Sequence, residues 1–276
     1  MEATRIAPTP SGFLHAGNAL NFLLAARLAR HHQARMRLRI DDLDAARMRP
    51  AYVQDIFDSL QWLGIRWDEG PQDAATFHTS GSQRLRIGRY EEMLARLVNT
   101  GRVYACTCSR TQRAQAGAVH ACRDAALPLN APDAAWLLKV EPGTMVRIPA
   151  LHGTDVHVDL AQVMGDPVVR QRLGTPAYQI ASLTDDIDHR ITFLVRGEDL
   201  LPSSACQLHI AELIGETGFL QERMVHHALM RDAKGHKLSK SEGATSLKAM
   251  RERGESPEML NAQADALFAR VLSGDR

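Results

Sequence analysis

The chain has 276 residues, 45% of them hydrophobic, which is enough to bury a substantial core in one or two folded domains. Because 33 Lys and Arg residues are balanced by 32 Asp and Glu residues, the net charge is only +1, and an anionic partner must be bound by local basic patches. No apolar run approaches the roughly 20 residues of a membrane span and no signal peptide follows Met1, so we expect a cytoplasmic protein that contacts no membrane.

The first part of the chain alternates the patterns of strands and helices. Residues 5–20, RIAPTPSGFLHAGNAL, begin like a strand and break at prolines and glycines, and after this stretch Leu20, Leu23, Leu24 and Leu28 recur at helical spacing. The run 36–40, MRLRI, is typical of a short strand, and Pro50 can begin a helix that Gly64 can close. Residues 90–98 repeat the amphipathic helical pattern. Short connections between these elements predict an α/β fold, with a parallel sheet and helical crossovers.

The pattern changes between about Val103 and Arg170, where short β-like runs are separated by Pro and Gly, and we expect an inserted β-rich subdomain. Strand-like runs at 177–183 and 191–195 then restore the α/β pattern, and a helix follows whose Cys206 we expect in the core. A last helix has Ser256 as its expected cap and Pro257 at its start. We therefore divide the chain into a first α/β half, an insertion, a second α/β half and a C-terminal helical segment, at 1–102, 103–171, 172–232 and 233–276.

The opening strand, loop and helix are typical of a phosphate site, because such a turn directs backbone N–H groups and a helix N-terminus at an anion. The chain contains neither the P-loop spacing nor the G-x-G-x-x-G spacing of dinucleotide folds. His15 and Asn18 lie three residues apart and can contact one ligand, while Gly17 leaves room for a flat base. The alternative is an ordinary capped helix start.

The segment 235–243, GHKLSKSEG, places Lys237 and Lys240 between glycines and has too little apolar content to be buried. Its alternative interpretation is a solvated charged loop. A lysine loop combined with a histidine at a helix start suits in-line transfer at an α-phosphate, where negative charge spreads over the phosphate oxygens.

These two motifs, HAGN and KLSKS, resemble the HIGH and KMSKS signatures of class I aminoacyl-tRNA synthetases, with Leu238 where the second usually has Met. The segments LRIDDLDAARMRP, LQWLGIRWDEGP, VRGEDLL and TSLKAMRERGESPEML resemble glutamyl-tRNA synthetases, so that the similarity covers nearly the whole chain. The resemblance implies a Rossmann-type catalytic domain that uses ATP with Mg²⁺. It further implies catalytic roles for His15, Asn18, Lys237 and Lys240, and ATP contacts from these residues together with Gly17 and Ser239.

The resemblance also implies a glutamate pocket. Its members are Arg5, Ala7, Thr9, Asp41, Tyr178, Ser182 and Arg196. Arg5 and Arg196 match the positions that hold the glutamate carboxylates, which suits the planar, bidentate guanidinium. Thr9 replaces the usual serine, and Tyr178 and Ser182 share one face if their segment is a strand. Asp41 stands where the family has a glutamate that binds the α-amino group, so its arm is one methylene shorter.

Three of the four cysteines fall in the expected insertion, too few and too unevenly placed for a disulfide framework. Cys106, Cys108 and Cys122 resemble the Cys-x-Cys…Tyr-x-x-x-Cys zinc cluster of these synthetases, although Ala118 takes the tyrosine position. His120 is the nearest alternative fourth ligand. The competing interpretation is three reduced cysteines without a metal.

Glutamyl-tRNA synthetases carry a helical anticodon-binding region after the catalytic domain, and the present chain ends at Arg276. At this length it resembles the glutamyl-Q tRNA(Asp) synthetases, shortened paralogues that attach glutamate to queuosine in the anticodon of tRNA(Asp). We expect a monomer that binds glutamate and the tRNA(Asp) anticodon loop. An acid-free basic run from Arg27 to Arg39 is either an RNA-facing surface or a solvated helix face. The alternatives are a glutamyl-tRNA synthetase acting on the 3′ end of tRNA(Glu), a small-molecule adenylyltransferase, and a non-catalytic RNA-binding paralogue.

Overall fold

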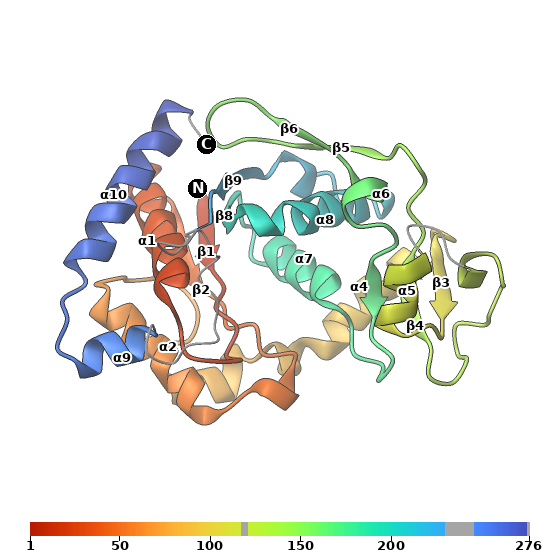
Figure 1. Cartoon of the computed structure of the whole chain (residues 1–276), viewed down its shortest axis with the longest axis horizontal. Coiled ribbons are helices and arrows are strands. Elements are labelled where there is room, and N and C mark those ends of the chain that lie inside the picture. The colour runs from red at the N-terminus through yellow and green to blue at the C-terminus, as the bar shows by residue number, and fades with distance from the viewer. Residues whose placement is uncertain (117–120, 230–245, 275–276) are drawn as a thin grey trace.

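The computed structural model describes residues 1–116, 121–229 and 246–274, which form an α/β body with a small β sheet at one end (Figure 1). The predicted α/β class is confirmed. The strands are β1 (Ala3–Ile6), β2 (Arg35–Leu38), β3 (Val103–Cys106), β4 (Ala135–Leu138), β5 (Met145–Ile148), β6 (Val156–Asp159), β7 (Val168–Arg170), β8 (Phe193–Gly197) and β9 (Arg223–His227). The α-helices are α1 (Ala16–His31), α2 (Pro50–Trp62), α3 (Ala74–Thr76), α4 (Ile87–Val98), α5 (Arg110–Ala116), α6 (Leu160–Val163), α7 (Tyr178–Asp188), α8 (Leu201–Leu213), α9 (Leu247–Glu252) and α10 (Glu258–Ser273).

Two parallel strand pairs form the centre of the body. β1 pairs with β2 and β8 pairs with β9, and the connections run through α1 and α8. The pairs meet where Thr192 N donates to the carbonyl of Ala3 at 2.8 Å and Thr4 Oγ1 donates to the carbonyl of Phe193 at 2.9 Å. The strands therefore lie in the order β2, β1, β8, β9, and the predicted parallel arrangement with helical crossovers is confirmed.

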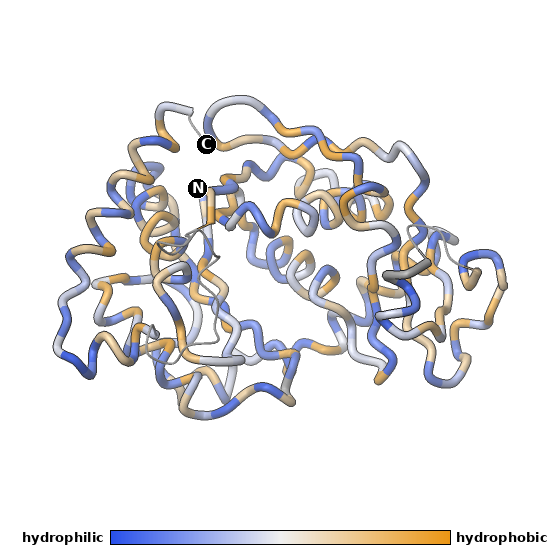
Figure 2. The backbone as a smooth tube through the Cα atoms, in the orientation of Figure 1, coloured by the Kyte–Doolittle hydropathy of each residue, from blue (hydrophilic) through white to orange (hydrophobic). Residues whose placement is uncertain are grey.

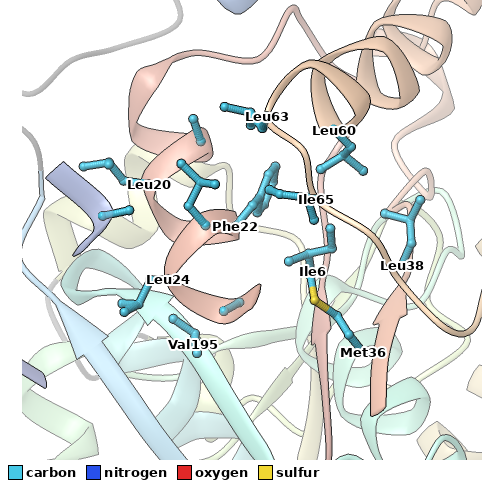
Figure 3. Close-up of a cluster of buried hydrophobic side chains, with 14 of the residues drawn as sticks. Ile6, Leu20, Phe22, Leu24, Met36, Leu38, Leu60, Leu63, Ile65 and Val195 are labelled. Atoms are coloured by element: carbon cyan, nitrogen blue, oxygen red, sulfur yellow. The ribbon is translucent and has the colours of Figure 1, made fainter. Parts of the chain in front are cut away.

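One face of these strands packs against α1, α2 and α10. Figure 3 shows Ile6, Leu38 and Val195 from the strands beside Phe22 and Leu24 of α1, all of them buried. Burying each such side chain stabilises the fold by about 1.5–3 kcal/mol. α10 lies beside α1 (Figure 1). No helix within the described ranges is both long and apolar enough to cross a membrane.

The other face packs against α4, α7 and α8, and here one prediction was wrong. Residues 177–183 were expected as a strand, but α7 is a helix that begins at Tyr178. Residues 180–186 are all buried, so burial does not alternate along the segment as it would in a half-buried strand. Cys206 of α8 is fully buried among apolar side chains, as predicted.

The short strands expected between Val103 and Arg170 are present, in two separate groups. β3, β4 and β7 form an antiparallel sheet at the far end of the molecule (Figure 1). The β5–β6 hairpin instead adjoins β9, because Leu151 N donates to the carbonyl of Met224 at 3.0 Å and Met224 N donates to the carbonyl of Pro149 at 2.8 Å. The boundaries of the inserted subdomain stay a prediction.

The C-terminal helix begins one residue later than expected. Pro257, not Ser256, is the N-cap of α10, and its carbonyl accepts hydrogen bonds from Asn261 N at 2.9 Å and Asn261 Nδ2 at 3.1 Å. The connection between α9 and α10 is mostly hydrophilic (Figure 2).

A buried carboxylate connects the first loop, α2 and α9. Asp55 is 2% exposed, and its two oxygens accept from Leu14 N at 3.3 Å and from Arg251 Nη2 at 2.7 Å. The other terminal nitrogen of Arg251 donates to Ser59 at 2.6 Å. This one side chain therefore fixes the position of the loop just before α1.

We expect Asp55→Ala to lower the free energy of unfolding by about 3 kcal/mol, because it leaves Arg251 and the Leu14 N–H without their acceptor. Asp58→Ala is the matched control, since Asp58 lies 3.9 Å from the same arginine but is exposed. Its effect should stay below about 1 kcal/mol. Urea denaturation measures both, and equal effects would contradict this role of Asp55.

Candidate functional site

The loop after β1 and the start of α1 line a pocket of about 450 Å³. The opposite wall comes from residues at the ends of β8 and β9 and just after them, including Gly197 and Leu229. The pocket therefore lies at the carboxyl ends of β1 and β8, where parallel α/β sheets commonly bind ligands. Five of the predicted site residues line it together, and these are Ala7, Thr9, His15, Gly17 and Asn18.

His15 and Asn18 form a reciprocal cap on α1. His15 Nδ1 accepts from Gly17 N at 3.1 Å, and Asn18 Oδ1 accepts from His15 N at 3.1 Å. Because Nδ1 is an acceptor, the proton of the neutral imidazole lies on Nε2. The sequence offered two alternative interpretations of this segment, a capped helix start and a ligand-contacting surface. The structure has both, because His15 and Asn18 cap α1 and also line the pocket.

Gly17 is close to the His15 ring. A Cβ atom at this position would lie 3.0 Å from His15 Cε1 and 3.1 Å from its Nδ1. A side chain there would push the imidazole out of the position in which it caps the helix. Glycine was expected here because it leaves room for a base. The contact with His15 is a second reason why this position requires glycine.

His227 and Asn21 were missed in the sequence. Both line the pocket, and His227 Nε2 lies 3.0 Å from Asn21 Oδ1 while its Nδ1 lies 2.9 Å from the carbonyl of Ala228. Burial lowers the pKa of His227, which favours the neutral ring. Asn21 follows Gly17 by one helical turn, a spacing that indicates a common face, whereas the sequence around His227 carries no such signal.

Beside the pocket lies a buried charged cluster centred on Asp186 of α7. Its carboxylate accepts from Arg5 at 3.1 and 3.3 Å and from Arg39 at 2.7 Å, and lies 3.5 Å from Arg196. Burial alone would raise the pKa of Asp186, but the three guanidinium groups outweigh it and lower this pKa. The structure thus joins Arg5 and Arg196, as predicted, around a carboxylate that the sequence analysis did not single out.

Arg39 brings Asp41 and Ser182 into the same cluster. Its guanidinium donates to both carboxylate oxygens of Asp41, at 2.6 and 3.1 Å, and to Ser182 Oγ at 3.0 Å. Burial raises the pKa of Asp41, and the charge of Arg39 opposes this shift. Asp41 is therefore placed close to the other predicted pocket residues, but a substrate amino group would have to compete with Arg39 for its oxygens.

Tyr178 lies at the edge of this cluster, near enough to Arg196 for the two side chains to interact electrostatically. It is 38% exposed at the start of α7 and lines a groove of about 730 Å³ with Arg110, Arg113 and Leu173. Ser182, one helical turn further on, is fully buried. The two residues share a helical face rather than the predicted strand face, and they lie at different depths.

The three cysteines of the expected zinc cluster lie together. The sulfur atoms of Cys106, Cys108 and Cys122 all lie within 4.8 Å of one another, and the Cys108 and Cys122 sulfurs are 3.4 Å apart. Thiolates around a tetrahedral zinc ion are about 3.8 Å apart, given Zn–S bonds of about 2.3 Å. These side chains fit three corners of a zinc site, and His120, the expected fourth ligand, lies outside the described residues.

The lysine motif also lies outside the described residues, and with it Lys237, Ser239 and Lys240. The residues that flank the segment do reach the pocket. Leu229 lines it, Ser246 pairs with His15, and Leu247 N donates to the carbonyl of Leu14 at 2.8 Å. The roles expected for the lysine motif stay predictions.

The basic run from Arg27 to Arg39 is mostly neutralised by acidic residues of the same chain. The pairs are Arg27 with Asp265, Arg35 and Arg37 with Glu69, and Arg39 with Asp41 and Asp186. Paired guanidinium groups attract phosphate less than free ones do, because the partner carboxylate opposes their charge. Among the described residues this pairing argues against the run as a continuous RNA-facing surface.

Comparison with known proteins agrees with this architecture. Residues 2–121 and 151–271 match the family described as tRNA synthetases class I (E and Q), catalytic domain. Glutamate–tRNA ligase 2 of Gluconobacter oxydans is 34% identical over 98% of this chain and 61% of its own length, and the glutamate–tRNA ligase of Symbiobacterium thermophilum is 33% identical over 93% and 56%. The chain thus spans little more than half the length of these relatives.

Solved structures show the same fold. The glutamate–tRNA synthetase of Elizabethkingia anophelis superposes with a TM-score of 0.71 at 23% identity, covering 87% of this chain and 53% of that one. The methionyl-tRNA synthetase of Mycobacterium tuberculosis gives a TM-score of 0.54 at 13% identity over 91% and 62%. Because the family match includes the central strands, the pocket and the residues around Asp186, this chain belongs to the class I tRNA synthetases of the E and Q group and contains their catalytic domain.

Proposed function

We propose that the chain activates glutamate with ATP, giving glutamyl-adenylate and pyrophosphate. One observation carries the proposal: the charged cluster and the pocket meet at the ends of neighbouring strands. Ala7 lies two residues after Arg5 of β1, Gly197 directly follows Arg196 of β8, and both Ala7 and Gly197 line the pocket. Guanidinium groups that suit carboxylates therefore adjoin a helix N-terminus that suits phosphate.

In the proposed reaction an oxygen of the glutamate α-carboxylate attacks the α-phosphorus of ATP. The bond from this phosphorus to the bridging oxygen breaks, and pyrophosphate leaves with the electron pair. The N-terminus of α1 and the Nε2–H of His15 favour the negative charge on the phosphate oxygens. By the family resemblance, Lys237 and Lys240 stabilise the same charge.

The incomplete hydrogen bonding of Arg196 supports a carboxylate substrate. Among the described residues, its buried Nε has no hydrogen-bond partner. A buried donor without an acceptor costs about 1–3 kcal/mol, and a substrate carboxylate would supply the missing acceptor. Arg5 also contacts the carboxylate of Asp186 and would add a second positive charge to the site of the substrate carboxylate.

We further propose that the glutamyl group passes to a hydroxyl of queuosine in the anticodon of tRNA(Asp). The hydroxyl oxygen attacks the carbonyl carbon of glutamyl-adenylate, the bond from this carbon to the phosphate oxygen breaks, AMP leaves with the electron pair, and the hydroxyl proton is released. The sequence resemblance to the glutamyl-Q enzymes supports this acceptor. The described part of the C-terminal segment belongs to the catalytic body, since α10 packs on α1 through Arg27 and Asp265 at 2.6 Å. The second candidate acceptor is the 3′ end of tRNA(Glu), favoured by the similarity to proteins named glutamate–tRNA ligases.

We also propose that Cys106, Cys108 and Cys122 hold a zinc ion. Metal analysis of the purified protein should then find about one equivalent of zinc. Cys108→Ser should lose the metal, because it removes one thiolate. Cys206→Ala is the matched control, since Cys206 is buried away from the cluster, and it should keep the metal. A wild-type protein that is purified without zinc and cannot bind it would refute the site.

The activation step is tested by pyrophosphate exchange that depends on glutamate and proceeds without tRNA. Lys240→Ala should reduce the exchange rate by about 10²–10³, by analogy with removing one preorganised donor to a developing charge. Lys139→Ala, at a lysine just after β4 that lies 3.9 Å from Asp124, should exchange at the wild-type rate. Undiminished exchange by Lys240→Ala would remove this lysine from the mechanism, and exchange that strictly requires tRNA would favour the tRNA(Glu) candidate.

The acceptor is tested with labelled glutamate and three tRNAs: tRNA(Asp) with queuosine, tRNA(Asp) without it, and tRNA(Glu). We expect label only on the queuosine-containing tRNA(Asp), and we expect it to survive removal of the 3′ CCA end. Label that is lost with the CCA end, or equal charging of tRNA(Glu), would instead establish the 3′-end acceptor.

A further inference from the structure

Two polar side chains of α8 hold the terminal nitrogens of Arg196. Nη1 donates to Ser204 Oγ at 2.8 Å, and Nη2 donates to Gln207 Oε1 at 2.7 Å. Ser204 and Gln207 are three residues apart, so they lie on one face of the helix, and both are fully buried. α8 thus presents a matched pair of acceptors to one end of the guanidinium.

Ser204 in turn contacts His226 of β9. Its Oγ lies 2.8 Å from His226 Nε2. The hydroxyl has a single proton, and because its oxygen already accepts from Arg196, the proton can be donated to an unprotonated Nε2. In this arrangement Arg196 donates to Ser204 and Ser204 donates to His226, and each hydrogen bond polarises the next.

The anchoring is one-sided. Both terminal nitrogens of Arg196 have acceptors on α8, and Nη2 also lies 3.5 Å from Asp186 Oδ2, whereas the buried Nε has no partner among the described residues. An arginine that served only as the counterion of Asp186 would not need two neutral acceptors that hold its far end. The arrangement fixes the plane of the guanidinium and leaves an N–H for another acceptor.

We infer that Ser204 is a positioning residue for Arg196 and that, together with Gln207 and His226, it sets the affinity of the site for the substrate carboxylate. The inference rests on the proposed activation of glutamate. Planar, bidentate binding of a carboxylate depends on the orientation of the guanidinium, so loosening its anchor weakens binding of the amino acid. ATP binds at the adjoining pocket, which these residues do not line, and its affinity does not depend on the anchor.

The test measures glutamate-dependent pyrophosphate exchange by wild type and Ser204→Ala, with the thermal midpoint of each. Ser204→Ala should raise the KM for glutamate by about tenfold or more, the effect of a lost charge-assisted hydrogen bond. The KM for ATP and the kcat should each stay within about twofold, because the pocket is unchanged. A loss of stability alone would not separate the two KM values in this way.

Two variants act as controls. Ser204→Thr keeps the hydroxyl and should restore most of the affinity for glutamate. Ser203→Ala removes the neighbouring hydroxyl, which contacts Gln179 at 3.1 Å and not Arg196, and should leave both KM values unchanged. An unchanged glutamate KM in Ser204→Ala, or an equal rise in both KM values, would overturn the inference.

Gln207→Glu decides the question if Ser204→Ala does not fold. Its carboxylate keeps an acceptor on Arg196 Nη2 and adds a charge that competes with the substrate, so the KM for glutamate should rise while the protein stays folded. An unchanged KM in this folded variant would overturn the inference. A wild-type protein without any glutamate-dependent exchange overturns the proposed function itself, which distinguishes the two failures.

Discussion

The fold and the candidate site both depend on the carboxylate of Asp186. Three buried guanidinium groups surround it: Arg5 from β1, Arg39 directly after β2 and Arg196 from β8. A buried carboxylate without partners would be strongly unfavourable, and so would these arginines without it. The cluster therefore ties three strands and α7 together at the point where the two halves of the chain meet. Replacing the cluster by apolar side chains would remove the three guanidinium groups that suit a carboxylate ligand.

This constraint explains where the site lies. β1 and β8 lie side by side through the hydrogen bonds of Ala3 and Thr4, and a pocket of about 450 Å³ lies beyond their carboxyl ends. The arginines on these strands point to the α7 side and are fixed by Asp186. Ala7, two residues after Arg5, and Gly197, one residue after Arg196, form part of the pocket wall. The arginines that suit a carboxylate are thus separated by only one or two residues from the pocket that suits a phosphate.

Much of this could be predicted because it is local. Pro50 at the first turn of α2, Gly64 after its end at φ +70°, and the leucine spacing of α1 each specify an element within a few residues. The cysteine cluster was expected from the family resemblance, and its third member, Cys122, lies 14 residues after Cys108. His15 was found from its motif, although its capping of α1 became clear only from the backbone geometry.

The errors came from interactions between distant residues. The run 177–183 was expected as a strand, whereas α7 extends from Tyr178 to Asp188 and includes the buried Asp185 and Asp186. Their charges are balanced by arginines far away in the sequence, such as Arg5 and Arg86, so the helix continues through them. For the same reason the basic run looked free, although Glu69 and Asp265 neutralise parts of it.

The most direct test of this account is a crystal structure with glutamate and a non-hydrolysable ATP analogue bound together. The account predicts glutamate carboxylate oxygens at about 3 Å from Arg5 and Arg196, with the α-phosphate of the analogue beside His15 and the start of α1. Glutamate bound elsewhere, with both arginines contacting only Asp186 and the residues of α8, would contradict it.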